Sequence, residues 1–225
     1  MLEKIIYGSK KIRKSRLHDE KGNFVGWNRF LRHFPHAAST GVLRISVGYR
    51  PQIPWISYDA IKTLRQFLTK DSRVLEFGSG MSTLWYANYA GEVCSVEDYL
   101  PWYQKVSGFL GKTMIENVNY CFADSSEAYC SFMSNDTAGF DLIMVDGSNR
   151  SACIANSLKL LKPGGILYLD NSDKHSGAEG GDTRIAEACA LTYAKEKAAA
   201  ITYFTDFAPT QFFVQQGLMI KTPAC

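Results

Sequence analysis

The chain has 225 residues and a formal net charge of +3; 46% of its residues are hydrophobic and 21% are charged. This size and balance are typical of one sizeable globular domain and exclude a fibrous or disordered chain. No apolar run approaches the roughly 20 residues that a transmembrane helix needs, and no signal-peptide core follows the N-terminus, so we expect a cytoplasmic protein.

The first part of the chain, residues 1–50, is basic and aromatic, and we expect it to form an irregular or helical cap over a domain at residues 51–225. Residues 1–16 hold six Lys or Arg against one Glu, a net charge of +5 (six minus one). Such a stretch favours weak contact with an anionic membrane surface, although charged runs of this kind are more commonly solvated arms.

A helix is expected directly after this boundary. Pro51 and Pro54 mark the boundary itself, and Ser57 is a candidate N-cap. The apolar residues from Ala60 to Leu68 recur at helical spacing, so one face of this helix should be buried.

Residues 73–80 are the most informative stretch of the chain. Residues 73–77 predict a short buried strand, which runs into the turn Gly78-Ser79-Gly80, and a helical pattern begins at Ser82. Because glycine has no side chain, backbone N–H groups in such a turn can approach a ligand closely at the N-terminus of the helix.

Two acids flank this turn. Glu97 follows Glu76 by 21 residues (76 to 97), and a carboxylate about 20 residues beyond such a strand can accept both ribose hydroxyls of a nucleoside. A dinucleotide fingerprint would have glycine where this chain has Thr83, and Glu76 would repel a pyrophosphate. A carboxylate at this point suits a ligand with a positively charged amino-acid end.

Strands and helices then alternate, which predicts a parallel sheet with right-handed crossovers. We expect strands at residues 93–97, 118–123, 141–145 and 165–169, and helices at about 100–111, 125–133, 150–161 and 183–197. Two β-rich runs, 200–205 and 212–220, predict an antiparallel hairpin at one side of the sheet. We interpret Lys162-Pro163-Gly164-Gly165 as a helix stop before the fifth strand.

This order of features resembles the class I S-adenosylmethionine-dependent methyltransferases, whose first motif, acid-x-Gly-x-Gly, is matched by residues 76–80. The resemblance covers residues 57–220. It implies an α/β fold with a Rossmann-like, doubly wound, seven-stranded sheet, mostly parallel with an antiparallel C-terminal hairpin. Together with the spacing above, it implies that S-adenosylmethionine binds at Glu76, Gly78, Ser79, Gly80, Ser82, Thr83, Glu97 and Asp124.

Two of these assignments have competitors. Asp98 lies beside Glu97 and could take its place at the ribose. Asp124 lies at the position where the family often has a residue that contacts the adenine amino group. However, Asp124-Ser125-Ser126-Glu127 is equally a capping box for the following helix.

Acidic side chains also end the fourth and fifth strands. Asp146, Asp170 and Asn171 would form an all-oxygen cluster of the kind that suits Mg²⁺. The pattern is similar to that of catechol-type and caffeoyl-coenzyme-A-type O-methyltransferases, whose metal lowers the pKa of a substrate hydroxyl. The similarity implies that Asp146 is both a metal ligand and part of the catalytic machinery.

The chain departs from those relatives at one point. They carry a lysine shortly after the first metal-binding Asp, where this chain has Gly147-Ser148-Asn149-Arg150. His175 is the nearest substitute as a base, although a loop histidine is more often solvated. Acids also end these strands in metal-free methyltransferases, and Asp-Asn is a common turn pair, so a metal-free site stays open.

We therefore expect an S-adenosylmethionine-dependent methyltransferase that acts on a hydroxyl of a small-molecule acceptor. The Asn/Asp-Pro-Pro-Tyr/Phe and Pro-Cys motifs of nucleic-acid enzymes do not occur, so nucleic acid is not expected as a partner; a homodimer stays open. One alternative is a methyltransferase-like binding or scaffold domain without activity. Another is a nicotinamide-dependent oxidoreductase, which Thr83 and Glu76 disfavour.

Overall fold

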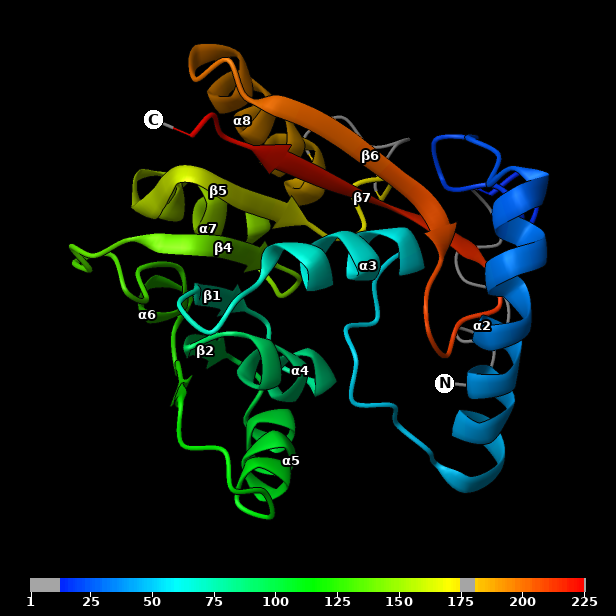
Figure 1. Ribbon diagram of the computed structural model, residues 1–225, viewed down its shortest axis with the longest axis horizontal. Helices are drawn as coiled ribbons and strands as arrows, with labels where there is room; N and C mark the ends of the chain where they lie inside the picture. Colours follow the sequence, from blue (N-terminus) through cyan, green and yellow to red (C-terminus); the bar gives the residue numbers. More distant parts are fainter. Residues whose placement is uncertain (1–12, 175–180, 225) are drawn as a thin grey trace.

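The computed structural model describes residues 13–174 and 181–224 and has an α/β fold in which helices cover both faces of one sheet (Figure 1). The strands are β1 (Arg73–Phe77), β2 (Glu92–Glu97), β3 (Val118–Phe122), β4 (Phe140–Val145), β5 (Leu161–Leu169), β6 (Ala200–Phe207) and β7 (Val214–Lys221). The helices are α2 (Trp27–Val47), α3 (Tyr58–Phe67), α4 (Met81–Tyr89), α5 (Leu100–Leu110), α6 (Ser126–Cys130), α7 (Arg150–Ser157), the 3-10 helix η1 (Leu158–Leu160) and α8 (Asp182–Glu196).

The seven strands are ordered β3-β2-β1-β4-β5-β7-β6. The first five are parallel, and β7 pairs antiparallel with both β5 and β6. The expected doubly wound sheet with an antiparallel C-terminal hairpin is confirmed. The strand order reverses between β1 and β4, and open α/β sheets bind ligands beyond the carboxyl ends of the strands at such a point.

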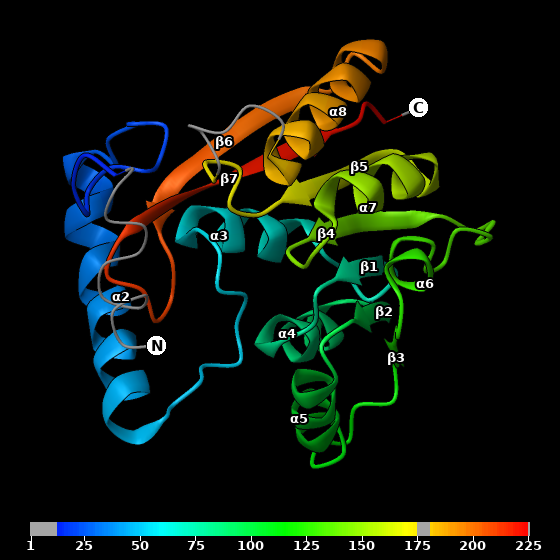
Figure 2. The same ribbon diagram turned by 180° about the vertical axis from the view of Figure 1, so that it is seen from behind.

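The sheet is buried on both faces, which explains its nearly continuous apolar strands. In β4, Leu142 and Met144 pack on the side of α3 and α4, whereas Ile143 and Val145 pack on the side of α6, α7 and α8. Because successive side chains of a strand point to opposite faces, helices are needed on both sides. Figure 2 shows the second face, with α7 and α8 lying across the sheet.

The fifth strand differs from its expected form. It begins at Leu161, so Lys162-Pro163-Gly164-Gly165 lies inside the strand and does not end a helix. The pairing with β4 shifts here, since β5 advances from 161 to 166 while β4 advances from 140 to 142. An irregularity in which Gly164 has a φ of 76° absorbs the additional residues. The helix-stop interpretation was therefore wrong.

The N-terminal segment contains the long helix α2, which lies beside the ends of β6 and β7 (Figures 1 and 2). Its Phe30, Phe34 and Ala37 pack against Phe207 and Val214. Burial of these side chains from both elements removes apolar surface from water and stabilises the contact. Among the residues that the structure describes, no helix is long and apolar enough to cross a membrane.

Part of the expected solvated arm belongs to the folded protein. The guanidinium of Arg13 is buried and pairs with Glu20 at 3.3 Å and with Asp173 at 3.4 Å. The sequence could not reveal this, because Asp173 follows β5, far along the chain. The remainder of the basic arm, residues 1–12, lies outside the described residues.

Candidate functional site

The candidate site begins at the turn between β1 and α4. Gly78 has a φ of 90°, a left-handed conformation that favours glycine. A Cβ atom at residue 78 would stand 2.6 Å from the Cα of Gly147. The turn after β1 therefore packs directly on the turn after β4, and residue 78 has no room for a side chain.

Beneath this turn, Glu76 is fully buried. Its carboxylate accepts hydrogen bonds from the hydroxyls of Ser82 (2.5 Å), Thr83 (2.6 Å) and Ser95 (2.7 Å). Burial raises the pKa of Glu76 to about 7, and the three hydroxyls oppose this shift. The side chain thus fastens the start of α4 to β2. Its contact with a positively charged ligand group stays a prediction.

Glu97 ends β2 and faces the same turn. Its Oε2 accepts hydrogen bonds from the Ser79 backbone N–H (3.2 Å) and hydroxyl (3.1 Å), and its Oε1 accepts one from the Tyr99 N–H (3.0 Å). Burial raises the pKa of this carboxyl. Asp98, the competitor for the ribose, instead accepts a hydrogen bond from Ser148. Glu97 is therefore the acid that lies against the glycine turn.

Asp146 and Asp170 end neighbouring strands, and their carboxyl groups face each other. Burial, followed by the charge of Asp146, raises the pKa of Asp170 well above its ordinary value, and a hydrogen bond between the two side chains adds to the shift. The Asp146 side chain is 37% exposed and lines a cavity beside the glycine turn. The pair therefore places Asp170, whose protonated form is favoured, in the interior and Asp146 at the cavity.

Two cations lie beside this acid pair. Arg150 Nη2 lies 3.3 Å from Asp146 Oδ1, and its Nη1 donates to the backbone oxygen of Asp170 at 2.5 Å. Lys174 donates to Asn171 Oδ1, and burial, followed by the charge of Arg150, lowers the pKa of Lys174. Sequence reasoning missed Lys174, although its spacing of four residues from Asp170 could have drawn attention to it.

The side chains as placed do not suit the expected magnesium ion. Asn171 Oδ1 is already bonded to the ammonium group of Lys174, and Arg150 and Lys174 already place two positive charges beside the acid pair. A divalent cation would therefore have to displace Lys174 and overcome the repulsion of Arg150, which is buried, and of Lys174, which is half-buried. These residues fit a metal-free site better, and no step below uses a metal.

Two further predicted residues lie away from this geometry. Asp124 is exposed beyond the end of β3, and the N-cap of α6 is its neighbour Ser125, whose hydroxyl accepts from the Ala128 N–H at 3.2 Å. The helix cap is thus supplied by Ser125, and Asp124 stays a candidate for the adenine. His175, the candidate base, lies outside the described residues.

A cavity of about 100 Å³ lies between the glycine turn and Asp146. It is lined by Ile53, Trp55, Gly78, Ser79, Gly80, Met81, Ser82, Trp102 and Asp146. The indole N–H of Trp102 donates to the backbone oxygen of Ser79 at 2.8 Å, so this ring closes one side. Trp55 lies before α3 and Trp102 lies on α5, so the two indoles come from segments far apart in the sequence.

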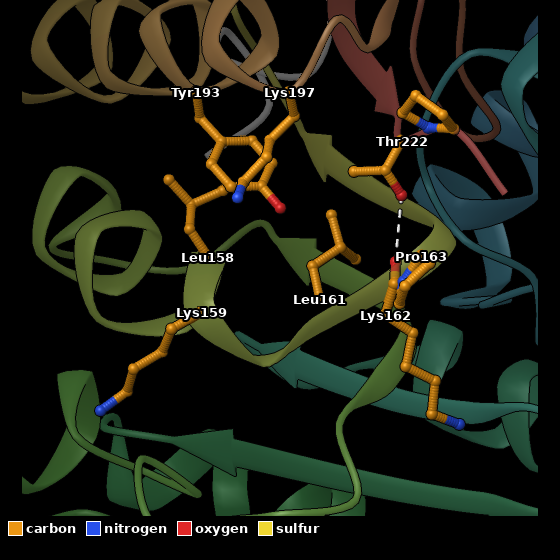
Figure 3. Close-up of a pocket in the computed structure, with 9 residues that line it drawn as sticks. Leu158, Lys159, Leu161, Lys162, Pro163, Tyr193, Lys197 and Thr222 are labelled. Atoms are coloured by element: carbon orange, nitrogen blue, oxygen red, sulfur yellow. Dashed lines mark hydrogen bonds between the residues drawn. The ribbon is translucent and has the colours of Figure 1, made fainter. Parts of the chain in front are cut away.

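A larger hollow of about 330 Å³ lies at the other edge of the sheet (Figure 3). Its walls include Leu161 at the start of β5 and Thr222 just after β7, together with Tyr193 and Lys197. Ligands of open α/β sheets bind at the carboxyl ends of the parallel strands, and this hollow lies at the opposite end of β5. None of the predicted site residues lines it.

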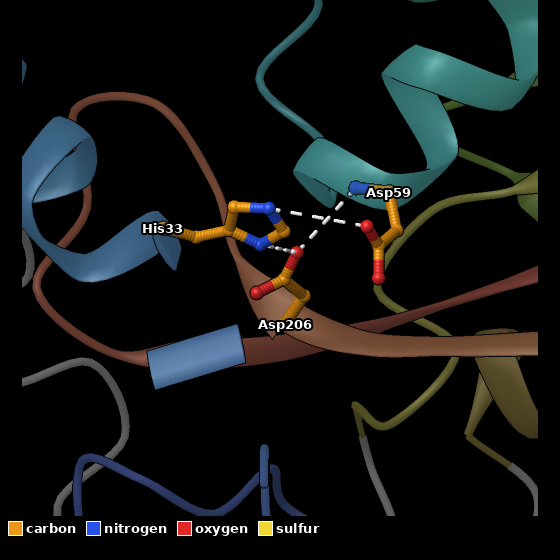
Figure 4. Close-up of side chains that lie close together, drawn as sticks. All are labelled: His33, Asp59 and Asp206. Atoms are coloured by element: carbon orange, nitrogen blue, oxygen red, sulfur yellow. Dashed lines mark hydrogen bonds and ion pairs between the residues drawn. The ribbon is translucent and has the colours of Figure 1, made fainter. Parts of the chain in front are cut away.

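A separate cluster of ionisable side chains joins α2, α3 and β6 (Figure 4). His33 Nδ1 lies 2.7 Å from Asp206 Oδ2, and its Nε2 lies 3.9 Å from Asp59 Oδ1. Asp59 also accepts from Arg29 Nε at 2.7 Å. Burial raises the pKa of Asp206, and His33 opposes this shift. Each carboxylate has a partner within the protein, so the cluster links α2, α3 and β6 to one another.

Comparison with known proteins finds matches among solved structures. No protein-family model matches the sequence, and no curated protein is similar to it. The cofactor-bound protein Rv0187 from MTB is 19% identical, with a TM-score of 0.62, over 85% of this chain and 98% of that one.

Two other solved structures are similar to the chain. An O-methyltransferase from Bacillus cereus in complex with SAH is 13% identical, with a TM-score of 0.56, over 84% of this chain and 98% of that one. An rRNA methylase from Streptococcus thermophilus is 15% identical, also with a TM-score of 0.56, over 78% of this chain and 98% of that one. At such identities the likeness establishes the fold.

Proposed function

We propose that this chain, which has the fold of the class I S-adenosylmethionine-dependent methyltransferases, transfers a methyl group from S-adenosylmethionine to a hydroxyl of a small acceptor. The observation that carries the proposal is the contact between Glu97 and the turn at residues 78–80. A carboxylate that ends the second strand opposite such a turn suits the two ribose hydroxyls of a nucleoside. The ribose would use the same carboxylate, whose Oε2 now accepts from Ser79 and whose Oε1 accepts from the Tyr99 N–H.

The other residues of the turn and its surroundings take supporting roles. Backbone N–H groups at the start of α4 suit the polar end of the cofactor, and Asp124 suits its adenine amino group. Trp55 and Trp102 cover the cavity and would exclude water from it. S-adenosylmethionine supplies an electrophilic methyl group, so the protein chiefly has to orient the acceptor oxygen, and such positioning can be worth about 7–11 kcal/mol.

Asp146 is the group that we assign to the proton of the acceptor hydroxyl. It is the acid among the cavity-lining residues, and its partner Asp170, with a pKa raised by burial, keeps its own proton. Arg150 holds the Asp146 side chain in place through its Nη2 contact at 3.3 Å. A carboxylate so placed can accept a proton as the new oxygen–methyl bond forms. His175 stays a second candidate for this role.

The fold leaves the acceptor open, because O-methyltransferases and an rRNA methylase share it. A cavity of about 100 Å³ bordered by two indoles favours a small molecule. Incubation with S-adenosylmethionine carrying an isotopically labelled methyl group, followed by separation of a cell extract into small-molecule, RNA and protein fractions, tests this choice. Label in the small-molecule fraction is expected, and label in RNA would contradict it.

A binding module without catalysis is the second candidate. It is favoured by the absence of a lysine shortly after Asp146, where this chain has Gly147-Ser148-Asn149-Arg150. The two candidates differ in one measurement. Protein that binds S-adenosylhomocysteine but transfers no label to any fraction would be a binding module.

Calorimetry with S-adenosylhomocysteine tests the cofactor site itself. We expect binding by the wild-type protein, and binding at least about tenfold weaker in Glu97→Gln, because the neutral amide is a poorer acceptor for two ribose hydroxyls. Glu116→Gln changes an exposed glutamate and is the matched control. The absence of both heat and a thermal shift in the wild-type protein at millimolar ligand would remove the proposal.

A further inference from the structure

Two arginines near the cavity stand without a carboxylate partner. Arg44 lies in the last turn of α2 and Arg50 just beyond that helix, and both are half-buried. Within residues 13–174 and 181–224, no ion pair joins either of them to an acid. The arginines that do form ion pairs there are Arg13, Arg29, Arg73, Arg150 and Arg184.

Both guanidinium groups lie against the indoles of the cavity. Arg44 Cζ is 4.5 Å from the centroid of the Trp55 ring. Arg50 Cζ is 5.6 Å from the same ring and 5.3 Å from the Trp102 ring. Since Trp55 and Trp102 line the cavity, two positive charges lie directly against its indole walls.

This arrangement leaves the two charges only partly compensated. Stacking on an indole stabilises each cation, and Arg44 Nη1 also donates to Thr210 Oγ1 at 3.0 Å. Burial, followed by the charge of Arg50, nevertheless lowers the pKa of Arg44. A carboxylate or phosphate bound beside both groups would remove their repulsion, and a guanidinium fork matches two oxygens of such a group.

We propose that Arg44 and Arg50 form the anion-binding end of this cavity and take a carboxylate or phosphate of a molecule bound there. The inference rests on the proposed function for the identity of that molecule. Two molecules could carry the anionic group: the acceptor, or the methyl donor through its methionine carboxylate. The acceptor would then be a hydroxyl compound that also carries an anionic group.

Calorimetry with two nucleosides separates these sources. S-adenosylhomocysteine carries the carboxylate, and 5′-methylthioadenosine lacks the whole amino-acid part. If the donor supplies the anion, Arg44→Gln and Arg50→Gln bind S-adenosylhomocysteine at least about tenfold more weakly than the wild type and bind 5′-methylthioadenosine equally well. Arg65→Gln is the matched control, because Arg65 is exposed and stacks on Tyr89 at 4.0 Å, outside the cavity lining.

If the acceptor supplies the anion, S-adenosylhomocysteine binds all variants equally. Inorganic phosphate titrated into protein saturated with S-adenosylhomocysteine then changes the tryptophan fluorescence of the wild type and of Arg65→Gln, because Trp55 and Trp102 contact the two arginines. The same titration of Arg44→Gln and Arg50→Gln requires at least about tenfold more phosphate. Arg50→Lys keeps the positive charge. It should therefore require more phosphate than the wild type and less than Arg50→Gln.

The proposal is overturned if Arg44→Gln and Arg50→Gln bind both S-adenosylhomocysteine and phosphate as the wild type does. It is equally overturned if wild-type protein gives no phosphate response and the variants bind S-adenosylhomocysteine normally. Failure of the proposed function gives a different result, because wild-type protein then binds neither S-adenosylhomocysteine nor 5′-methylthioadenosine. In that case phosphate titration of the unliganded protein still decides whether the anion site exists.

Discussion

At the scale of single residues, Glu76 links the fold to the candidate site. The carboxyl group is buried beneath the glycine turn and receives hydroxyl donors from both α4 and β2. The largest effect on its pKa is the loss of hydration, which raises the pKa to about 7. Burial without a neighbouring cation disfavours the charged form, so this residue makes the stability of the protein depend on pH.

The substitution Glu76→Gln tests this dependence. Since the folded-state pKa of about 7 lies above the ordinary value of 4.5, the stability that the protonated carboxyl contributes is complete below pH 4.5 and is lost as the pH rises through 7. From pH 5 to 8 the free energy of unfolding of the wild type should fall by about 2–3 kcal/mol relative to Glu76→Gln. Urea denaturation at each pH measures it.

The exposed residue Glu127 provides the control for this experiment. Glu127→Gln should follow the wild-type pH profile, because an exposed carboxyl has nearly the same environment in both states. Parallel profiles for Glu76→Gln and the wild type would mean that Glu76 is not the group responsible.

At the scale of elements, the site depends on two turns that touch. The turn after β1 and the turn after β4 meet at Gly78 and Gly147, where neither residue has room for a Cβ atom. Their contact places Asp146 beside the turn at residues 78–80 and so forms the cavity. Parallel strands that are neighbours in a sheet bring their carboxyl ends to the same edge, which is why this contact can form.

Alanine substitutions at two glycines of the same turn should differ in their effect on stability. Gly78→Ala needs a positive φ and puts a Cβ 2.6 Å from Gly147 Cα, so we expect a loss of about 2–4 kcal/mol of stability. Gly80 has an extended φ of 179°, and the nearest atom to its added Cβ is Ser82 Oγ at 3.6 Å. Gly80→Ala should therefore stay close to the wild-type thermal midpoint; equal losses in both variants would contradict this account.

At the scale of the whole molecule, the cavity depends on segments far apart in the sequence. Arg44 and Arg50 come from the N-terminal segment, Trp102 from α5 and Asp146 from the end of β4. The position of α2 relative to the sheet is therefore part of the site. Besides its apolar contacts, α2 is held by His33, whose imidazole lies between Asp206 and Asp59 (Figure 4).

Replacement of His33 tests whether its contacts with Asp206 and Asp59 hold α2 in place. His33→Gln removes the partner 2.7 Å from Asp206 Oδ2 and leaves that oxygen the longer contacts from the Ser57 hydroxyl and the Asp59 N–H, both at 3.4 Å; loss of a hydrogen bond to a buried carboxyl costs about 1–3 kcal/mol. We expect that loss in urea denaturation, together with faster hydrogen exchange in α2. His36→Gln changes an exposed histidine of the same helix and should leave both measurements unchanged. Unaltered exchange in His33→Gln would show that the apolar contacts alone hold α2.

Much of the fold could be read from local patterns. The alternation of strands and helices, the turn at residues 78–80 and the acid at Glu97 are features of neighbouring residues, and each lies where it was expected. The helix stop at residues 162–165 was wrong, because β5 pairs with β4 at Leu161 and again from Ile166, and the residues between these two points continue the strand as an irregularity. Local propensity yields to pairing where neighbouring strands supply hydrogen-bond partners.

The amino-acid order therefore set the strand types, the glycine turn and the acids at the strand ends, because these follow from the spacing of neighbouring residues. It left open which charges and rings would meet around them. Arg13 at Asp173, Arg150 at the backbone of Asp170 and Arg50 against Trp102 were settled by the docking of elements in space. Contacts between distant segments depend on packing and burial of the whole chain, which no single stretch of sequence specifies.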